Sequence, residues 1–486
     1  MGLLVSLFAQ APSNPTEEKK TKTKKSLKIS PEKAALLRKV EAFKATCLDE
    51  VYTTQPIREN TMEAALQYPP SDPASKYLLP GSHKHLGGAF DPTDGCIYGV
   101  PANSKAVLCL YPEGDTYKMT SIPLPKNKRD MKMKWLRGIF AHGYLWAIPA
   151  WADSVLCVDV DAYWGRREKK GEIVQLLDLP TEHPKGMQWQ WHGAGINNEK
   201  TAIFCIPSNA QSVLKVDLAA KTTSFIPIEC DSSQYPDFRL DLVNKWYGGI
   251  LGKDNAVYGI PYRSCAVLRI DCNTSTAKLI GPDVGCSKYN WHGGIQVHGK
   301  IYAHPSHADD TVLVIDTNPG APQLCYTLPI ERASYDKDDR KNYKWLGGAV
   351  GADGNIYCPA CDTSAVLRID TRTDKCTTFG FAGTDKNKWQ GGILGPDGCI
   401  YCIPASGMHV LRIATMPGIE GDPPVQLVGN MPTHKDKWQG GHVGKDGSLY
   451  FIPENGYRVL KLTPPKSPPI IVDGKLPEDD VKIEFM

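Results

Sequence analysis

Lysine recurs along this chain at one position, directly before a Trp or His that opens a small, glycine-rich segment. If these positions were equivalent in the fold, the lysines would form a ring and focus positive potential, which attracts an anion or an acidic protein. The alternative is structural, with each aliphatic stem packed on the neighbouring ring and each ammonium group solvated. The lysines are Lys84, Lys134, Lys245, Lys344, Lys388 and Lys437.

Two histidines, His192 and His292, each lie one step beyond a Trp in the same glycine-rich segments. Metal binding needs three or four converging ligands, and no carboxylate aligns with these two side chains. We therefore expect His192 and His292 to join the lysines at a binding mouth, and we predict neither a metal nor a cofactor.

One loop has a more metal-like composition, because His304 and His307 are spaced three residues apart and are followed by Asp309 and Asp310. Solvated polar loops often look the same, so this cluster does not change the expectation. The chain has no glycine-rich phosphate loop, no nucleophile elbow and no recognisable Ser/His/Asp set. No catalytic residue is predicted.

These positions recur because one pattern repeats from residue 81 to residue 465. Its fullest copy runs Lys388-Trp389-Gln390-Gly391-Gly392, Asp397-Gly398, Ile400-Tyr401, Pro404, Val410-Leu411. Copies follow one another at intervals of 44 to 56 residues, a period that indicates an array of small structural units. The second glycine of the motif, or its equivalent, is Gly88, Gly138, Ala194, Gly249, Gly294, Gly348, Gly392 and Gly441.

Each copy encodes four short strands. The Gly-Gly run is the first strand, and the Asp-Gly that follows it favours a type I′ hairpin turn. The second strand alternates apolar and variable residues and ends at proline. A β-branched run and a weaker fourth run form the third and fourth strands. Four antiparallel strands of this kind make one propeller blade. The sequence therefore predicts an all-β fold, a single eight-bladed β-propeller preceded by an N-terminal helix, with seven blades as the alternative because Ala194 breaks the motif. Glycines should line the axis, where strands converge, and the tryptophans and tyrosines should fill the space between blades.

Antiparallel order fixes which loops share a face of the propeller. Turns between strands one and two, and between strands three and four, lie on one side. Loops between strands two and three, together with the links between blades, lie on the other side, where the lysines also fall. Variable loops concentrate binding residues. If the lysines are structural, the long links at residues 162–188 and 330–343 become the better candidates.

The repeat resembles the propellers of the NHL and virginiamycin B lyase-like type, and more loosely kelch propellers. The resemblance rests on Gly-x-Asp-Gly-x-Ile-Tyr, as at residues 395–401, and on Val-Leu-Arg-Ile-Asp, as at residues 366–370. It covers about four-fifths of the chain and implies a propeller architecture. The catalytic histidines and acid of the lyase have no matching positions here, so the resemblance implies no site residue, and fold alone does not choose a function.

Outside the repeats, we expect a polar disordered tail at residues 1–29, an amphipathic helix at 30–52, a linker at 53–80 and a C-terminal tail at 466–486. The first residues match the N-myristoylation pattern at Gly2. One acyl chain holds a membrane only marginally, and the lysines between residues 19 and 28 would supply the second signal that stable anchoring needs. The alternatives are a short signal peptide or an unmodified tail.

Composition narrows the function classes. The formal net charge is only +3, so the chain is not a basic nucleic-acid binder, and 15 cysteines within the repeats suit buried reduced thiols in the cytoplasm. The prediction is a non-enzymatic scaffold or binding propeller for protein partners of acidic character. It would be cytoplasmic, tethered to an anionic membrane by its tail, and either a monomer or a subunit of a larger complex. The alternative is a lyase or hydrolase acting on an anionic small molecule at the channel mouth.

Overall fold

The computed structural model describes residues 79, 81–286, 289–321, 324–336, 343–478 and 480–486. Every element below belongs to the unit Pro56–Met486. The predicted Gly2 acylation site, the tail at 1–29, the helix at 30–52 and the linker, apart from Leu79, lie outside the described residues. No described helix is long and apolar enough to cross a membrane.

The first half of the described chain forms four groups of antiparallel strands. The groups are β1 (His85–Phe90), β2 (Ile97–Pro101), β3 (Ala106–Glu113) and β4 (Thr116–Pro123); β5 (Trp135–Ala141), β6 (Tyr144–Pro149), β7 (Ser154–Asp159) and β8 (Val174–Asp178); β9 (Trp191–Ile196), β10 (Ala202–Pro207), β11 (Val213–Asp217) and β12 (Thr222–Ile226); and β14 (Trp246–Leu251), β15 (Ala256–Pro261), β16 (Val267–Asp271) and β17 (Thr276–Ile280). Three short elements accompany them, η2 (Lys126–Lys128), α3 (Val160–Tyr163) and β13 (Ile228–Glu229).

The second half follows the same plan. Its groups are β18 (Trp291–Val297), β19 (Lys300–Pro305), β20 (Thr311–Asp316) and β21 (Cys325–Glu331); β22 (Ala349–Val350), β23 (Ile356–Cys358), β24 (Ala365–Asp370) and β25 (Lys375–Phe381); β26 (Trp389–Leu394), β27 (Cys399–Pro404), β28 (Val410–Ala414) and β29 (Val425–Val428); and β30 (Trp438–Val443), β31 (Leu449–Pro453), β32 (Leu460–Thr463) and β33 (Lys482–Phe485).

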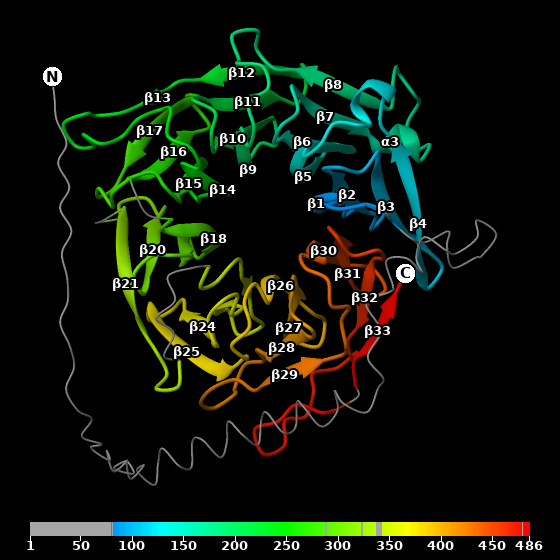
Figure 1. Ribbon diagram of the computed structural model, residues 1–486, viewed down its shortest axis with the longest axis vertical. Coiled ribbons are helices and arrows are strands. Elements are labelled where there is room, and N and C mark those ends of the chain that lie inside the picture. The colour runs from blue at the N-terminus through cyan, green and yellow to red at the C-terminus, as the bar shows by residue number, and fades with distance from the viewer. Residues whose placement is uncertain (1–78, 80, 287–288, 322–323, 337–342, 479) are drawn as a thin grey trace, which may run out of the picture. The chain divides into compact units, whose positions relative to one another are not determined.

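Neighbouring strands in each group are consecutive in the chain. One sheet of eight strands contains two such groups, joined where β21 and β25 pair in parallel at Ile330–Cys376 and Glu331–Thr377. Figure 1 shows the groups around a common axis, with β1, β5, β9, β14, β18, β26 and β30 innermost. The described strands therefore form an all-β propeller, which confirms the predicted fold class, and the third motif copy, which contains Ala194, forms the ordinary group β9–β12.

A repeated hydrogen bond joins each group to the one before it. The backbone N–H of the residue before the Trp or His of each motif copy donates to a carbonyl in the preceding group's loop between strands two and three, at 2.7–3.1 Å. The bond from Lys84 to Glu454, 3.0 Å long, joins the first group to the last and so closes the ring. The last group takes its fourth strand, β33, from residues 482–485, so the sheet continues past the boundary that we expected at residue 465.

The Asp-Gly turn differs from the expected type I′ hairpin. In the copy at Asp397-Gly398, only the glycine has positive φ, at 78°. Its N–H donates to Gly395 O at 3.1 Å, and Asp397 Oδ1 accepts from the Cys399 N–H at 3.2 Å. This is a type I turn closed by a left-handed glycine, and the aspartate has a different role from the expected one: its carboxylate holds the turn, as Asx residues do.

The same aspartate also fixes the aromatic of the second strand. Tyr401 donates its hydroxyl to Asp397 Oδ2 at 2.8 Å, and Arg412 from the third strand donates to the same oxygen at 3.0 Å. The equivalent tyrosines Tyr258, Tyr357 and Tyr450 make the same 2.8 Å bond to their own turn aspartates. Each ring is buried, as expected for residues that fill the space between blades.

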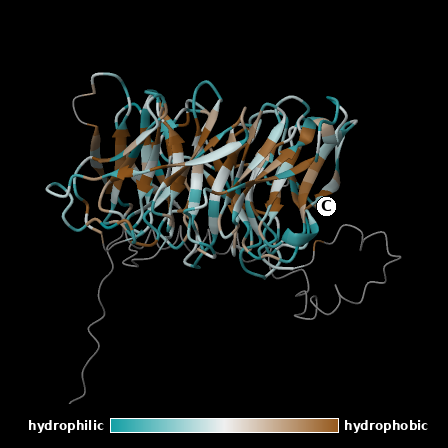
Figure 2. Ribbon diagram, turned by 90° about the horizontal axis from the view of Figure 1, so that it is seen from above, coloured by the Kyte–Doolittle hydropathy of each residue, from teal (hydrophilic) through white to brown (hydrophobic). Residues whose placement is uncertain are grey.

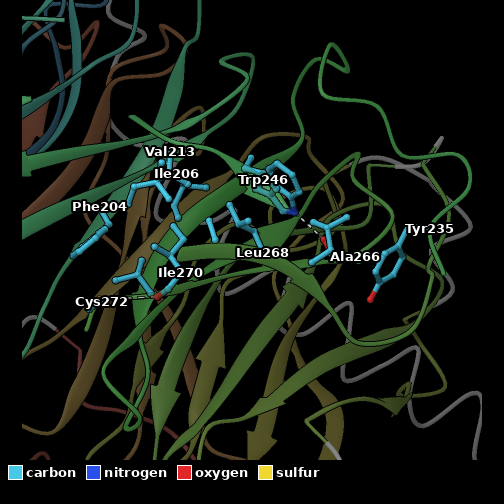
Figure 3. Packing of buried hydrophobic residues seen from close by; sticks show 14 of the residues in the cluster. Phe204, Ile206, Val213, Tyr235, Trp246, Ala266, Leu268, Ile270 and Cys272 are labelled. Atoms are coloured by element: carbon cyan, nitrogen blue, oxygen red, sulfur yellow. Dashed lines mark hydrogen bonds between the residues drawn. The ribbon is translucent and has the colours of Figure 1, made fainter. Parts of the chain in front are cut away.

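Hydrophobic clusters join adjacent groups rather than lying within one. In the cluster of Figure 3, Phe204 and Ile206 from the β9–β12 group pack with Trp246, Leu268 and Ile270 of the next group. Figure 2 shows hydrophobic residues concentrated along the strands and hydrophilic residues in the loops. Burial of apolar area therefore stabilises the contacts between neighbouring blades.

Glycine lines the axis because neighbouring inner strands touch there. A Cβ built on Gly193 would lie 1.7 Å from Gly248 O, and one on Gly347 would lie 2.8 Å from Gly391 Cα. No side chain fits at such separations, so close approach of the inner strands requires glycine at these two positions.

Candidate functional site

The six predicted lysines are buried, with exposed fractions of 0–8%. Their ammonium groups donate to backbone carbonyls of the links and loops that surround them. Lys388 Nζ, for example, donates to the carbonyls of Cys361, Thr363 and Asp385 at 3.0, 2.8 and 2.6 Å. The other five make the same kind of bond. The acceptors are the carbonyls of Gly81 for Lys84, Met131 for Lys134, Ser208 and Leu242 for Lys245, Ala308 for Lys344, and His434 for Lys437.

Burial also disfavours the charged form of four of these lysines. Loss of hydration lowers the pKa of Lys84, Lys134 and Lys437 to about 8, and that of Lys245 to about 7. The lysines therefore do not build the expected ring of solvent-facing charge. The structural alternative, which left the ammonium groups solvated, does not describe them either. Lys388 Nζ donates to three backbone carbonyls and lies 5.7 Å from the centroid of the Trp389 ring.

The tryptophans beside these lysines are structural. Trp389 Nε1 donates to His409 O at 2.8 Å, and Trp345 and Trp438 make the equivalent bond at 2.9 Å. The ring of each is at most 2% exposed. Each tryptophan thus ties the first strand of its group to the start of the third.

The two predicted histidines are brought together, and a tyrosine lies with them. His192 on β9 stacks on Tyr247 of β14, with ring centroids 3.9 Å apart and planes 24° apart. His292 on β18 contacts both edge-on, with centroids 5.8 Å from His192 and 4.8 Å from Tyr247. Burial is the main reason that the pKa of His192 falls to about 3, so both rings stay neutral at physiological pH and leave the channel mouth aromatic rather than basic.

Further rings extend this contact toward the loops. Tyr262 stacks on Tyr247 at 4.3 Å and lies 4.8 Å from Tyr289, while His307 lies 5.3 Å from Tyr289 and 5.0 Å from Tyr343. These rings come from the strand-two loops and links of neighbouring groups. We call the seven the aromatic face: His192, Tyr247, Tyr262, Tyr289, His292, His307 and Tyr343.

Solvent reaches the outer end of the aromatic face. Tyr289 and Tyr343 are 36% and 43% exposed, and Arg263 lies over the Tyr289 ring at 5.4 Å. Leu240, Val243 and Met408 are also exposed on the side of the propeller that carries the strand-two loops and the links. Large apolar side chains without cover mark interaction sites when they gather on one face.

Sequence reasoning missed the tyrosines of this face, although one signal was present. The signal lies at the residue directly before the lysine position of each copy. In seven copies this residue has positive φ: His83, Met133, Trp189, Asn244, Tyr343, Asn387 and Asp436. Asn and Asp tolerate that conformation, whereas bulky aromatic residues do not favour it. The aromatics with positive φ at this position, Trp189 and Tyr343, therefore stand out from what the backbone prefers.

The metal-like loop does not gather its ligands. His304 Nε2 accepts from the Gly347 N–H at 2.9 Å, whereas Asp310 pairs with Arg332 at 2.7 Å and with Lys344 at 2.6 Å. Across the ranges that the structure describes, no three His, Cys, Asp or Glu side chains are placed to hold a metal ion.

Of the two long links, only one contributes to the aromatic face. Residues 330–343 end at Tyr343. Residues 162–188 instead include β8 and a segment anchored on the first group, where Arg166 pairs with Asp91 at 2.9 Å and also with Asp94. This second link is held by structural ion pairs.

Comparisons with known proteins return structural relatives alone. No protein-family model matches the chain, and no curated protein matches it. Among solved structures, a streptogramin B lyase is 14% identical, with 68% of this chain and 93% of that chain covered and a TM-score of 0.46. Virginiamycin B lyase from Staphylococcus aureus is 13% identical over 68% of this chain and 94% of that chain, with a TM-score of 0.46. Hydrazine synthase from Kuenenia stuttgartiensis is 15% identical over 58% of this chain and 78% of that chain, with a TM-score of 0.37.

Proposed function

We propose that this protein is a binding propeller that holds a protein partner on its aromatic face. The observation that carries the proposal is the row of contacting rings that runs from His192 at the axis to the exposed Tyr289 and Tyr343. The expectation of an acidic partner loses its support because the six lysines are buried.

Physical chemistry favours a protein over a small molecule at this place. Tyrosine and arginine are enriched at the energetic centres of protein interfaces, because they give large contact areas at a low cost in side-chain entropy. Tyr289, Tyr343 and Arg263 supply such a combination on the side of the propeller that carries the longer loops. Leu240 and Val243, on the link before the β14–β17 group, are exposed on the same side of the propeller.

The test is a comparison of tagged variants in a native extract, followed by measurement of the isolated pair. Proteins enriched by the wild type are quantified against those enriched by a Tyr289→Ser/Tyr343→Ser double variant. A candidate partner is then purified and its Kd is measured for both. We expect the double variant to bind at least about tenfold more weakly, since a hot-spot residue contributes about 2 kcal/mol or more.

Leu324→Ser provides the matched control. Leu324 is 47% exposed and lies in the turn between β20 and β21, on the opposite side of the propeller. Loss of the same partner with Leu324→Ser, or unchanged binding by the double variant, would contradict the proposal.

Two further proposals concern the N-terminal tail and the channel mouth. The protein is proposed to act in the cytoplasm, held at an anionic membrane by acylated Gly2 and the lysines between residues 19 and 28. A second candidate function is a lyase or hydrolase acting on an anionic small molecule at the channel mouth. It is favoured by one observation: an arginine, Arg137, replaces a repeat glycine on an inner strand.

A further inference from the structure

Arg137 occupies a position that glycine fills in the other seven motif copies. Its φ is +63°, and the equivalent glycines have φ between +72° and +103°. The glycines are Gly87, Gly193, Gly248, Gly293, Gly347, Gly391 and Gly440. A long side chain in this conformation is strained, and such strain in a native structure is a reason to look for function.

The side chain of Arg137 belongs to the central channel, which we define as the space enclosed by the inner strands. Arg137 lies on the inner strand β5, and a Cβ built on Gly87 of β1 would lie 3.4 Å from its Cα. Solvent reaches this space, because the residues after the tryptophan in β14, β26 and β30 are partly exposed although these strands are innermost. Arg137 itself is exposed.

The guanidinium has no counter-charge in the channel. No hydrogen bond or ion pair joins it to any other residue that the structure describes. The inner strands, in their described bounds, contain no Asp, Glu or Lys, so Arg137 is their one fully charged side chain. The guanidinium therefore faces the solvent of the channel with all its donors free to bind an anion.

Neighbouring polar groups complete the surroundings. Burial and then the charge of Arg137 lower the pKa of His192, and Arg137 also contributes to the low pKa of His292 and His304. These histidines are therefore neutral and do not compete with Arg137 for an anion. His192 Nδ1 is buried without a hydrogen-bond partner, while its ring is held by the stack on Tyr247.

We propose that the central channel is a binding site for a small oxyanion, a carboxylate or a phosphate, held by the guanidinium of Arg137 beside His192. Arginine suits this role because its fixed fork of donors matches two oxygens of either group. The site differs from the outer end of the aromatic face, so it does not depend on a protein partner. If the protein is instead a lyase or hydrolase, the guanidinium of Arg137 is the group that would hold its anionic substrate.

Thermal unfolding and calorimetry with inorganic phosphate and with acetate test this site, against sodium chloride at matched ionic strength. For the wild type we expect one oxyanion to raise Tm by about 2 °C or more at saturation, because a ligand that binds only the folded state stabilises it. Its Kd should weaken at least about tenfold in Arg137→Gly and Arg137→Asn, the loss expected for a charge-assisted hydrogen bond. Whichever oxyanion binds more tightly identifies the class.

Both variants are expected to fold, because Gly and Asn accept positive φ, and Tm without anion should equal or exceed that of the wild type. Arg372→Gln, which removes an exposed arginine from the opposite side, should bind like the wild type. The proposal is overturned if neither oxyanion shifts wild-type Tm beyond the chloride control, or if both neutral Arg137 variants retain wild-type affinity. Neither result would alter the partner-binding test on Tyr289 and Tyr343, so the two proposals can fail separately.

Discussion

At the scale of single residues, burial decides what a repeated side chain does. Lys388 and its equivalents are charged in the sequence, yet each ammonium group is buried and donates to backbone carbonyls of the adjoining links and loops. The indole N–H of Trp389 likewise donates to a backbone carbonyl, that of His409. A residue at a repeated position therefore stabilises the link beside it, and function is more readily found where one copy departs from the others, as at Arg137 or Tyr343.

Replacing Trp389 tests this reading of the tryptophans. Trp389→Ala should lower the free energy of unfolding by about 3–5 kcal/mol, because it leaves a cavity between neighbouring groups. Trp389→Phe, which keeps most of the ring but loses the bond to His409 O, should cost about 1–3 kcal/mol. Chemical unfolding of both variants measures the two values. A loss under about 1 kcal/mol for Trp389→Ala would place the ring outside the core.

Lys245 predicts a pH effect on stability. Its pKa in the folded protein is lowered to about 7, mainly by burial, from an ordinary value of 10.5. Between these values the unfolded chain binds more protons than the folded protein, so this lysine makes the free energy of unfolding rise with pH. Urea unfolding at pH 7 and pH 9 should show a steeper rise for the wild type than for Lys245→Met, by at most about 1.4 kcal/mol per pH unit. Equal slopes would contradict the lowered pKa.

At the scale of elements, the turn between the first two strands sets the geometry of each group. The turn aspartate accepts from the backbone N–H two residues on and from the tyrosine hydroxyl four residues on. In the group with Asp397 it also pairs with Arg412, which is fully buried and reaches Asp480 at 2.7 Å. One carboxylate thus ties turn, second strand and third strand together.

Two turn aspartates provide a matched comparison. Asp397→Ala should cost about 3–5 kcal/mol of stability, because it removes a partner from the buried charge of Arg412. Asp353→Ala should cost only about 1–3 kcal/mol, because Asp353 holds Tyr357 at 2.8 Å while the arginine of its group, Arg368, lies 3.9 Å from Asp422. Chemical unfolding of both variants gives the difference, and equal losses would mean that the ion pair does not contribute.

At the scale of the whole molecule, the repeats close into a ring by the same contact that joins every pair of neighbours. The Lys84 N–H donates to Glu454 O across the join, and the Leu79 N–H donates to Tyr457 O beside it. The C-terminal strand β33 lies in the group that meets the first one. No exchange of strands between the first and last groups is needed, so the join resembles the other interfaces.

The N-terminal tether is a separate prediction for the whole protein. Intact-mass analysis of protein purified from its native cells should show one acyl group on Gly2, which Gly2→Ala would abolish. Vesicles with anionic lipid should retain the acylated protein, with about 1 kcal/mol from each nearby lysine at low salt. A mature N-terminus beyond residue 11 would instead show cleavage and contradict the cytoplasmic assignment.

The sequence by itself determined the propeller, the order of strands within each repeat and the structural place of Trp389 and Tyr401. It could do so because hydrophobic alternation and turn residues are local patterns. Their recurrence at the same positions in every repeat also identifies the common pattern where a single copy departs from it. The type I′ turn was wrong because Asp-Gly fits two turn types, and a side-chain contact with Cys399 N–H chose between them.

Only the tertiary structure decided which side chains beside the links meet solvent. Lys388 and Tyr343 lie near the same loops, but three carbonyls enclose the first ammonium group, while the second ring stays uncovered. The links between the groups make that difference, and their lengths and conformations follow no repeat. The contact of His192 with Tyr247 likewise depends on how far neighbouring strands approach at the axis, and no pattern within a single repeat contains that distance.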